Sequence, residues 1–146
     1  MNVEIIIDEQ CAEARLVIYT REITAEINEL VKWFSDAQPL YLIGYKDDRL
    51  EILPPEALIR IYADQQKVFA QADHGIFSLR QRLYEIEDKL YQAHFVRISN
   101  SEIVNFKKVK NLDISLAGTI CLYFQNGVKT FVSRRYVAKI KTYLGI

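Results

Sequence analysis

The side chains best suited to bind a polar partner gather in the last third of the chain. The stretch FVRISNSEIVNF holds Arg97, Asn100 and Ser101 between two short apolar segments, and Lys107 and Lys108 follow it directly. Hydroxyl, amide and cationic groups of this kind bond the phosphates and base edges of nucleic acids. In the major groove, Asn pairs with adenine and Arg with guanine, each through two hydrogen bonds. The stretch therefore favours nucleic-acid binding.

A second pair of cations, Arg134 and Arg135, begins the predicted last helix, directly after a predicted hairpin strand. The helix dipole disfavours positive charge at an N-terminus, so this placement points to an external partner rather than to helix stability. The structural alternative is that Ser99 and Asn100 cap a helix and that the two arginines form a solvated first turn.

The formal charge of the chain is zero, but the charges are unevenly distributed. Residues 1–93 carry ten Lys or Arg and seventeen Asp or Glu, whereas residues 94–146 carry nine and two. A basic C-terminal part beside an acidic N-terminal part indicates a surface that binds a polyanion. Attraction between the two parts across an internal interface would explain the split equally well.

Residues that could support catalysis or hold a metal are sparse. The chain contains no GxGxxG, GxxxxGK[ST], HExxH or GxSxG motif. His74 lies in a DHG turn and His94 begins a predicted strand, and neither has a nucleophile nearby in the sequence. Cys11 and Cys121 have no metal-binding spacing with these histidines. We therefore expect no enzymatic activity, no metal and no cofactor.

Length and hydropathy limit the class of protein. A chain of 146 residues, half of them hydrophobic and 26% charged, is long enough for one good core and too short for two ordinary domains. No apolar run approaches the roughly 18–20 residues that cross a bilayer, and the N-terminus lacks a basic, apolar leader. We therefore expect a cytoplasmic protein.

The first 38 residues are predicted to form a short α+β extension. NVEIII and RLVIYT are rich in β-branched residues and predict two strands. A helix is predicted from Thr24 to Asp36, because its apolar residues share one face: Ile27, Leu30, Val31 and Phe34. The DAQP segment ends this pattern and sets the domain boundary. A receiver domain is excluded, since it needs roughly 120 residues of alternating strands and helices.

Residues 39–146 are predicted to be mostly β. LYLIGY and RLEIL predict a hairpin around KDD, and ALIRIYA and KVFAQA predict another around DQQ. Ser78 and Gln81 fit a capping box at the start of a helix. LDISL predicts a strand, and TICLYF and VKTFV predict a hairpin with a type I′ turn at Asn-Gly. Ser133 is the expected cap of a last helix that stops at Gly145.

Two motifs then give the chain a family resemblance. FVRISNSEIVN, followed by a hairpin and VSRRY before the last helix, resembles the LytTR DNA-binding domain of bacterial transcription regulators. That family shows an F-x-R-x-H-[RN]-S-x-[IL]-[IV]-N core and a C-terminal [VS]-S-R-R-Y. Ser99 stands where the family has His. The resemblance covers roughly residues 40–146, and its matching positions are Phe95, Arg97, Asn100, Ser101, Ile103, Val104, Asn105, Ser133, Arg134, Arg135 and Tyr136.

The resemblance implies an elongated, mostly β fold of the α+β class rather than a helix-turn-helix. In this family, loops between strands enter successive major grooves and bend the DNA. Carried over to this chain, the base contacts come from Gln66 or Lys67, from Asn100 and from Arg135. Phosphate contact or support is assigned to Arg97, Ser101, Lys107, Lys108 and Arg134. Asn105 is expected to bond its own backbone at a turn.

The resemblance also implies partners. The family binds direct repeats in double-stranded promoter DNA as paired copies, so residues 1–38 are expected to serve a homodimer. Similar short LytTR proteins often appear beside small membrane proteins, and the resemblance therefore implies a membrane-bound antagonist as a second hypothesis for residues 1–38. Alternatively, residues 1–38 pack on the β domain and complete its core. The rival interpretation of the whole chain is a β-rich protein-interaction or ligand-sensing module with a basic face.

Overall fold

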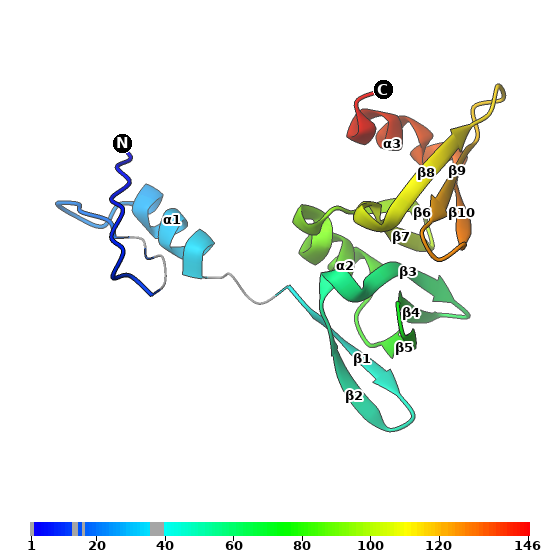
Figure 1. The fold of residues 1–146 in the computed structure, drawn as a ribbon, viewed down its shortest axis with the longest axis horizontal. Helices are drawn as coiled ribbons and strands as arrows, with labels where there is room; N and C mark the ends of the chain where they lie inside the picture. Colours follow the sequence, from blue (N-terminus) through cyan, green and yellow to red (C-terminus); the bar gives the residue numbers. More distant parts are fainter. Residues whose placement is uncertain (1, 13–14, 16, 36–39) are drawn as a thin grey trace. The chain divides into compact units, whose positions relative to one another are not determined.

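The chain forms two compact units, Met1–Gln38 and Pro39–Ile146 (Figure 1). The structure, a computed structural model, describes residues 2–12, 15, 17–35 and 40–146. Leu16, the DAQP segment and the side chains of residues 32–35, including that of Phe34, lie outside this description. Within the described ranges, no helix is long and apolar enough to cross a membrane.

The first unit contains one helix, α1 (Ala25–Ser35), among its described residues. Thr24 caps it, because its hydroxyl oxygen accepts the backbone N–H of Ile27 (3.2 Å). The two strands predicted in NVEIII and RLVIYT are wrong for the described residues, none of which lies in a strand. Ile5 and Ile7 are 86% and 90% exposed. High β propensity does not form a strand without a second strand to pair with.

The described residues of the second unit form two antiparallel sheets. The larger has the strand order β2-β1-β5-β4-β3-β7-β6, and the smaller has the order β10-β9-β8. The strands are β1 (Leu42–Lys46), β2 (Arg49–Leu53), β3 (Leu58–Asp64), β4 (Lys67–Ala72), β5 (Gly75–Leu79), β6 (Phe95–Ser99), β7 (Glu102–Asn105), β8 (Val109–Ile114), β9 (Ile120–Phe124) and β10 (Lys129–Val132). This architecture confirms the predicted mostly β class.

Two α-helices and four 3-10 turns complete the described part of the second unit. They are α2 (Leu83–Leu90), α3 (Val137–Leu144), η1 (Pro55–Ala57), η2 (Tyr91–Ala93), η3 (Phe106–Lys108) and η4 (Arg134–Tyr136). Strands β6 to β10 separate α2 from α3 along the chain. The unit is therefore not a helix-turn-helix, in which two helices follow one another across a short turn.

Two hairpins of the large sheet turn through two residues each. Asp47 and Asp48 join β1 to β2, and Gln65 and Gln66 join β3 to β4, with φ values of 49°, 63°, 48° and 66°. Two consecutive positive φ angles are the mark of a type I′ turn. The type I′ turn predicted at Asn-Gly between β9 and β10 is wrong, because of these two residues only Gly127 has a positive φ (84°). The backbone N–H of Phe124 donates to the carbonyl of Val128 (2.9 Å) and closes a loop of three residues, 125–127, for which a type I turn followed by a glycine bulge is common.

The starts of the two helices of this unit differ from the prediction. Ser78 lies in β5, where its hydroxyl donates to the carbonyl of Tyr45 in β1 (3.2 Å), so the predicted capping box is wrong. Arg82 occupies the N-cap of α2 without a capping hydrogen bond from its side chain. Ser133 makes no such bond either and precedes η4 rather than α3. Gly145, with φ 74°, ends α3 as predicted.

Two hydrophobic cores hold the second unit together, and strands β6 and β7 contribute to both. Neighbouring residues of a strand face opposite sides of the sheet. Phe95 and Ile103 thus join the core beneath α2, with Leu58, Ile61, Leu83, Ile86 and Leu90. Val96, Ile98 and Val104 join the core formed with the small sheet and α3, which includes Ile120, Leu122, Val132 and Ile140.

Asn105 links β7 to the backbone of two other segments. It is 2% exposed, and its amide nitrogen donates to the carbonyls of Leu58 (2.9 Å) and Pro55 (3.2 Å). Its Oδ1 atom accepts the backbone N–H of Lys107 (3.0 Å), which confirms the predicted bond to its own backbone at a turn.

Replacing Asn105 with Ala should lower the free energy of unfolding by about 2–4 kcal/mol, because it leaves buried backbone groups unpaired. Urea denaturation monitored by circular dichroism would measure this loss. Asn111→Ala removes the same side chain from an exposed position in β8 and should change stability by less than about 0.5 kcal/mol. Equal losses in the two variants would contradict a structural role for Asn105.

Candidate nucleic-acid interface

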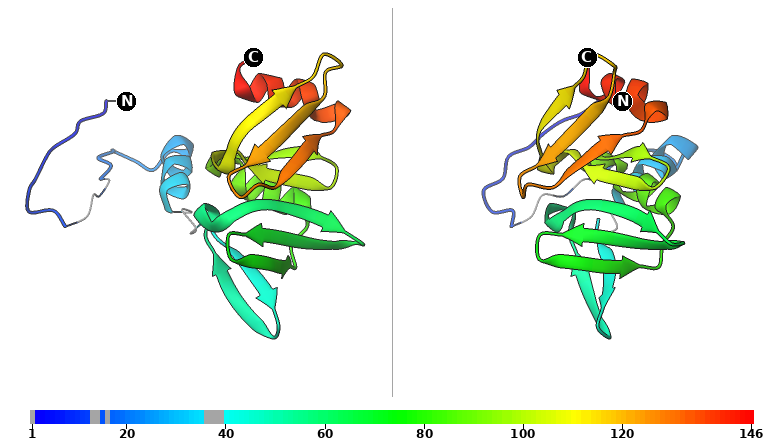
Figure 2. Two further views of the ribbon diagram at one scale, coloured as in Figure 1. Left: turned by 45° about the vertical axis from the view of Figure 1, so that its right-hand side comes forward. Right: turned by 90° about the vertical axis from the view of Figure 1, so that its right-hand side faces the viewer.

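Several strand ends of the large sheet meet at one edge, which we call the turn edge. Because neighbouring strands are antiparallel, the β3–β4 turn (Gln65–Gln66) and the β6–β7 connection (Asn100–Ser101) project from this same edge. Both views of Figure 2 show these two connections on one side of the sheet. The backbone N–H of Ala63, near the end of β3, donates to the carbonyl of Ser101 (2.8 Å) and ties the β3–β4 hairpin to the β6–β7 connection.

Arg97 holds the β6–β7 connection from behind. Its Nε donates to the carbonyl of Ser99 (2.9 Å), its Nη2 donates to the carbonyl of Asn100, and its Nη1 donates to Glu87 on α2 (3.0 Å). Glu87 also accepts a hydrogen bond from Lys139 on α3 (3.3 Å). All three guanidinium nitrogens are thus engaged within the protein, which places Arg97 as a support of the connection.

Asn100 is exposed at the turn edge and is oriented by a tyrosine. The hydroxyl of Tyr136 in η4 donates to Oδ1 of Asn100 (3.2 Å). Within the described residues Nδ2 of Asn100 has no hydrogen-bond partner, so its two N–H groups are available to an external acceptor. The backbone N–H of Ser133 donates to the carbonyl of Ile98 (2.9 Å), which brings η4 to the same edge.

Arg134 and Arg135 lie in η4 and not, as predicted, in the last helix itself. Both side chains are exposed, and neither has an ion-pair partner in the part of the chain that the structure describes. The Tyr136 bond to Asn100 fixes the next residue of η4, so the two arginines stand beside Asn100 at the turn edge.

Gln66 and Lys67 are exposed at the tip of the β3–β4 hairpin. The tip is conformationally unfavourable, since Gln65 and Gln66 both adopt positive φ, a region that Gly, Asn and Asp tolerate better. Asp64, the residue before the turn, faces Lys67 across the ladder. This backbone strain favours a functional role for the side chains of the turn.

Lys107 and Lys108 lie at the opposite end of β7 from Asn100, in η3. Lys108 forms an ion pair with Asp73 in the β4–β5 turn (3.0 Å), which belongs to the other edge of the sheet. The structure thus brings Gln66, Lys67, Asn100, Ser101, Arg134 and Arg135 together at the turn edge, with Arg97 behind them. It does not bring Lys107 and Lys108 to that edge.

Glu102 is a positioning residue that the sequence reasoning missed. Its carboxylate accepts hydrogen bonds from Arg60 in β3 (2.9 Å) and from Thr130 in β10 (2.6 Å), with 12% of the side chain exposed. It therefore joins the large sheet to the strand that leads into η4. These partners lie 42 and 28 residues away along the chain, so no local pattern could reveal them.

Two tyrosines of this unit, Tyr123 and Tyr143, have a raised pKa and are therefore uncharged at neutral pH. Hydrogen bonds with the side chains of Cys121 and Asp113 raise the pKa of Tyr123 to about 12. Burial, and then the neighbouring Tyr91, raise the pKa of Tyr143. No group of three or more His, Cys, Asp or Glu within the described ranges could hold a metal ion.

Comparison with known proteins identifies the family. Residues 48–145 match the family profile described as the LytTr DNA-binding domain. The chain belongs to the LytTR family. This confirms the resemblance seen in the FVRISNSEIVN and VSRRY motifs and makes the second unit a DNA-binding domain.

Individual relatives of this LytTR chain agree with that assignment. The chain is 31% identical to proteins named uncharacterized HTH-type transcriptional regulators in Staphylococcus aureus strains MSSA476 and NCTC 8325, over 100% of this chain and 99% of theirs. A solved LytTr DNA-binding domain from Bacillus cereus has the same fold, with a TM-score of 0.69 and 24% identity. The match covers 73% of this chain and 97% of that one.

Replacing Gln65-Gln66 with Asn-Gly should separate hairpin stability from DNA binding. The new pair suits the type I′ turn, so the free energy of unfolding should rise by about 1 kcal/mol. If the Gln66 side chain contacts DNA, affinity for the specific site should fall at the same time. Thermal unfolding and fluorescence anisotropy measure the two effects.

The matched control is Asp47→Asn with Asp48→Gly, the same change in the β1–β2 turn. It should raise stability by less, because Asp already tolerates positive φ better than Gln does, and, because it removes two negative charges, it should not lower DNA affinity. Unchanged affinity in the Gln65-Gln66 variant would exclude a DNA contact by the Gln66 side chain and leave Lys67 as the candidate base contact of this hairpin tip.

Proposed function

We propose that this LytTR protein is a non-enzymatic, sequence-specific regulator of transcription that reads promoter DNA with its turn edge. One observation carries the proposal: three segments far apart in the sequence, the β3–β4 hairpin, the β6–β7 connection and η4, are hydrogen-bonded into a single row. A row of projecting turns suits entry into successive major grooves. The names of the staphylococcal relatives support a role in transcription.

The base contacts are assigned to exposed side chains of that row. Nδ2 of Asn100 would donate to an acceptor such as adenine N7, while Oδ1 keeps a second lone pair for the adenine amino group. Arg135 would donate two hydrogen bonds to guanine. Gln66 or Lys67 would read a third position from the strained hairpin tip. Loops on rigid strands place such groups more accurately than flexible loops do.

Phosphate contacts are assigned to Ser101 and Arg134, which flank the base-reading groups. Arg97 supports the β6–β7 connection from behind. Phosphate contact by Lys107 and Lys108, predicted from the sequence, receives no support from their position at the far end of β7.

The regulator is proposed to act in the cytoplasm as a homodimer on direct repeats. Two copies would double the phosphate contacts and the number of bases read. The apolar face of α1, where Ile27 and Leu30 are only half-buried, is the proposed dimer contact. A small membrane protein that keeps the regulator from DNA is the antagonist that the family resemblance implies, and the acidic first unit is its proposed docking partner.

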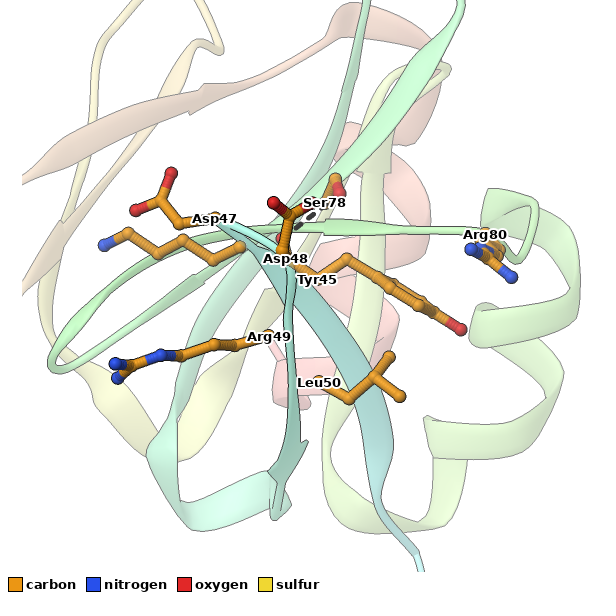
Figure 3. A pocket seen from close by; sticks show the side chains of 8 residues that line it. Tyr45, Asp47, Asp48, Arg49, Leu50, Ser78 and Arg80 are labelled. Carbon is orange, nitrogen blue, oxygen red and sulfur yellow. Dashed lines mark hydrogen bonds between the residues drawn. The ribbon is translucent and has the colours of Figure 1, made fainter.

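The rival function is a ligand-sensing or protein-interaction module, and its ligand-sensing form would need an enclosed binding site. A depression of about 520 Å³ lies at the β1–β2 hairpin (Figure 3). Its lining is mostly charged and includes Lys46, Asp47, Asp48, Arg49 and Arg80. A small-molecule site is expected to be mostly apolar with few polar groups, so this depression does not favour the rival.

The first test is a binding titration of the full chain with DNA from upstream of its own gene, beside scrambled DNA, at two salt concentrations. Affinity for the native fragment should exceed that for scrambled DNA by about 10³-fold or more. Asn100→Ala and Arg135→Ala should each weaken binding to the specific site by about 1–3 kcal/mol and change binding to scrambled DNA little. Unchanged specific affinity in both variants would overturn the assignment of base contacts.

Two further variants refine this test. Tyr136→Phe frees the Asn100 amide and should cost about 1 kcal/mol of specific affinity. Tyr143→Phe, its control, removes a hydroxyl that contacts His94 (3.0 Å) instead. Lys107→Ala tests whether Lys107 lies outside the interface or contacts a phosphate. Unchanged DNA affinity would agree with its position at the far end of β7, and an equal loss of affinity for every DNA sequence would indicate phosphate contact.

Replacing Ile27 and Leu30 together with Ser should convert the proposed dimer into a monomer, because polar residues cannot be buried there without cost. Sedimentation analysis of the wild type and the variant measures this directly. An unchanged dimer would exclude α1 as the dimer contact.

A further inference from the structure

The row of turns continues beyond the hairpin tip that carries Gln66. Strand β5 is the neighbour of β4 on the side away from β3, and Val68 pairs with Leu79 at the end of this ladder. Residues 80–82, which link β5 to α2, therefore emerge at the turn edge beside Lys67. Strand order thus places this link at one end of a row that runs through β4, β3, β7 and β6.

A groove of about 460 Å³ joins this link to the hairpin tip. It is lined by Gln66, Lys67, Val68, Phe69, Ser78, Leu79, Arg80, Gln81 and Arg82. Its charged groups are three cations, Lys67, Arg80 and Arg82, and its lining contains no carboxylate. Such a lining attracts an anion and offers several N–H donors to it.

Arg80 and Arg82 are exposed, and neither has an ion-pair partner among the residues that the structure describes. The Arg80 guanidinium packs over the ring of Tyr45, 4.2 Å from its centre. This contact restricts the guanidinium without using its hydrogen-bond donors, so less entropy is lost when it binds an anion.

Arg82 does not serve the helix that it begins. It occupies the N-cap of α2 without a capping hydrogen bond, and the helix dipole disfavours a cation there. Its charge is therefore better explained by an external partner than by the stability of α2.

We propose that Arg80 and Arg82 bind the DNA backbone just outside the position contacted by Gln66 or Lys67, as a phosphate clamp at the end of the row. This proposal rests on the proposed function and extends its footprint. The clamp would hold the strained β3–β4 tip in the major groove of the DNA. Phosphate contacts of this kind carry no base specificity of their own.

The depression of Figure 3 shows where this basic surface ends. It shares Ser78 and Arg80 with the groove, but the carboxylates of Asp47 and Asp48 also line it. These carboxylates sit in the β1–β2 turn, and Tyr45 pairs with Ser78, so the turn lies toward the start of β5 and away from Arg80. Arg49, beside them, is a matched control for the loss of one arginine.

The test measures the salt dependence of binding to the specific site, by fluorescence anisotropy with the full chain. The slope of log K against log salt is negative, and each lost phosphate contact lowers its magnitude by about 0.9, so Arg80→Ala with Arg82→Ala should lower this magnitude by about 1.8. The slope measured with scrambled DNA should change by the same amount. Arg82→Ala alone should lower the magnitude by about 0.9, and Arg49→Ala should leave it unchanged. Arg80→Lys with Arg82→Lys should keep most of the wild-type slope, since a Lys ammonium still binds phosphate.

A second arm shortens the specific duplex by one flank at a time. Removal of one flank should lower the affinity of the wild type by the same factor as the double Ala substitution does. The same removal should leave the affinity of the double Ala variant unchanged. A wild-type slope in the double variant, with specific binding intact, would overturn the clamp alone. Absence of specific binding by the wild type would overturn the proposed function itself.

Discussion

The burial of β6 and β7 between two hydrophobic cores is the constraint on which the rest of the second unit depends. Phe95 and Ile103 are held on one face, and Val96 and Val104 on the other, all with 1% or less of their surface exposed. A strand buried on both faces cannot shift its register without exposing one of these sets. The two-residue connection Asn100–Ser101 therefore projects from a rigid base, as a group that must meet a DNA base requires.

Polar contacts carry this rigidity across the turn edge to η4. Arg97 lies beside the irregularity where β6 departs from regular pairing, and its side chain donates to the carbonyls of Ser99 and Asn100 that follow. Glu102 joins Arg60 to Thr130, and Tyr136 joins η4 to Asn100. Half-buried charged groups of this kind stabilise little in sum, because desolvation offsets much of their attraction. Their value lies in fixing the spacing between the segments proposed to read DNA.

The turn edge gives up stability where contact with DNA is proposed. Gln65 and Gln66 adopt a turn that Asn-Gly would form more easily, and Arg82 begins α2 against the helix dipole. Arg134 and Arg135 add two neighbouring exposed cations without internal partners among the described residues. Each choice is unfavourable for folding alone and becomes reasonable beside a polyanion. The two cores supply the stability that these choices require.

Local patterns sufficed for the mostly β class, the hairpins around KDD and DQQ, the Gly145 stop and the family, because each depends on neighbouring residues or a short motif. They failed for the N-terminal strands, which lack a pairing partner, and for Ser78, whose hydroxyl bonds a strand 33 residues away. Strand order alone brought the turns of β3–β4 and β6–β7 to one edge and carried Lys107 to the other. Side-chain chemistry is local, but its position is decided by pairing between distant strands.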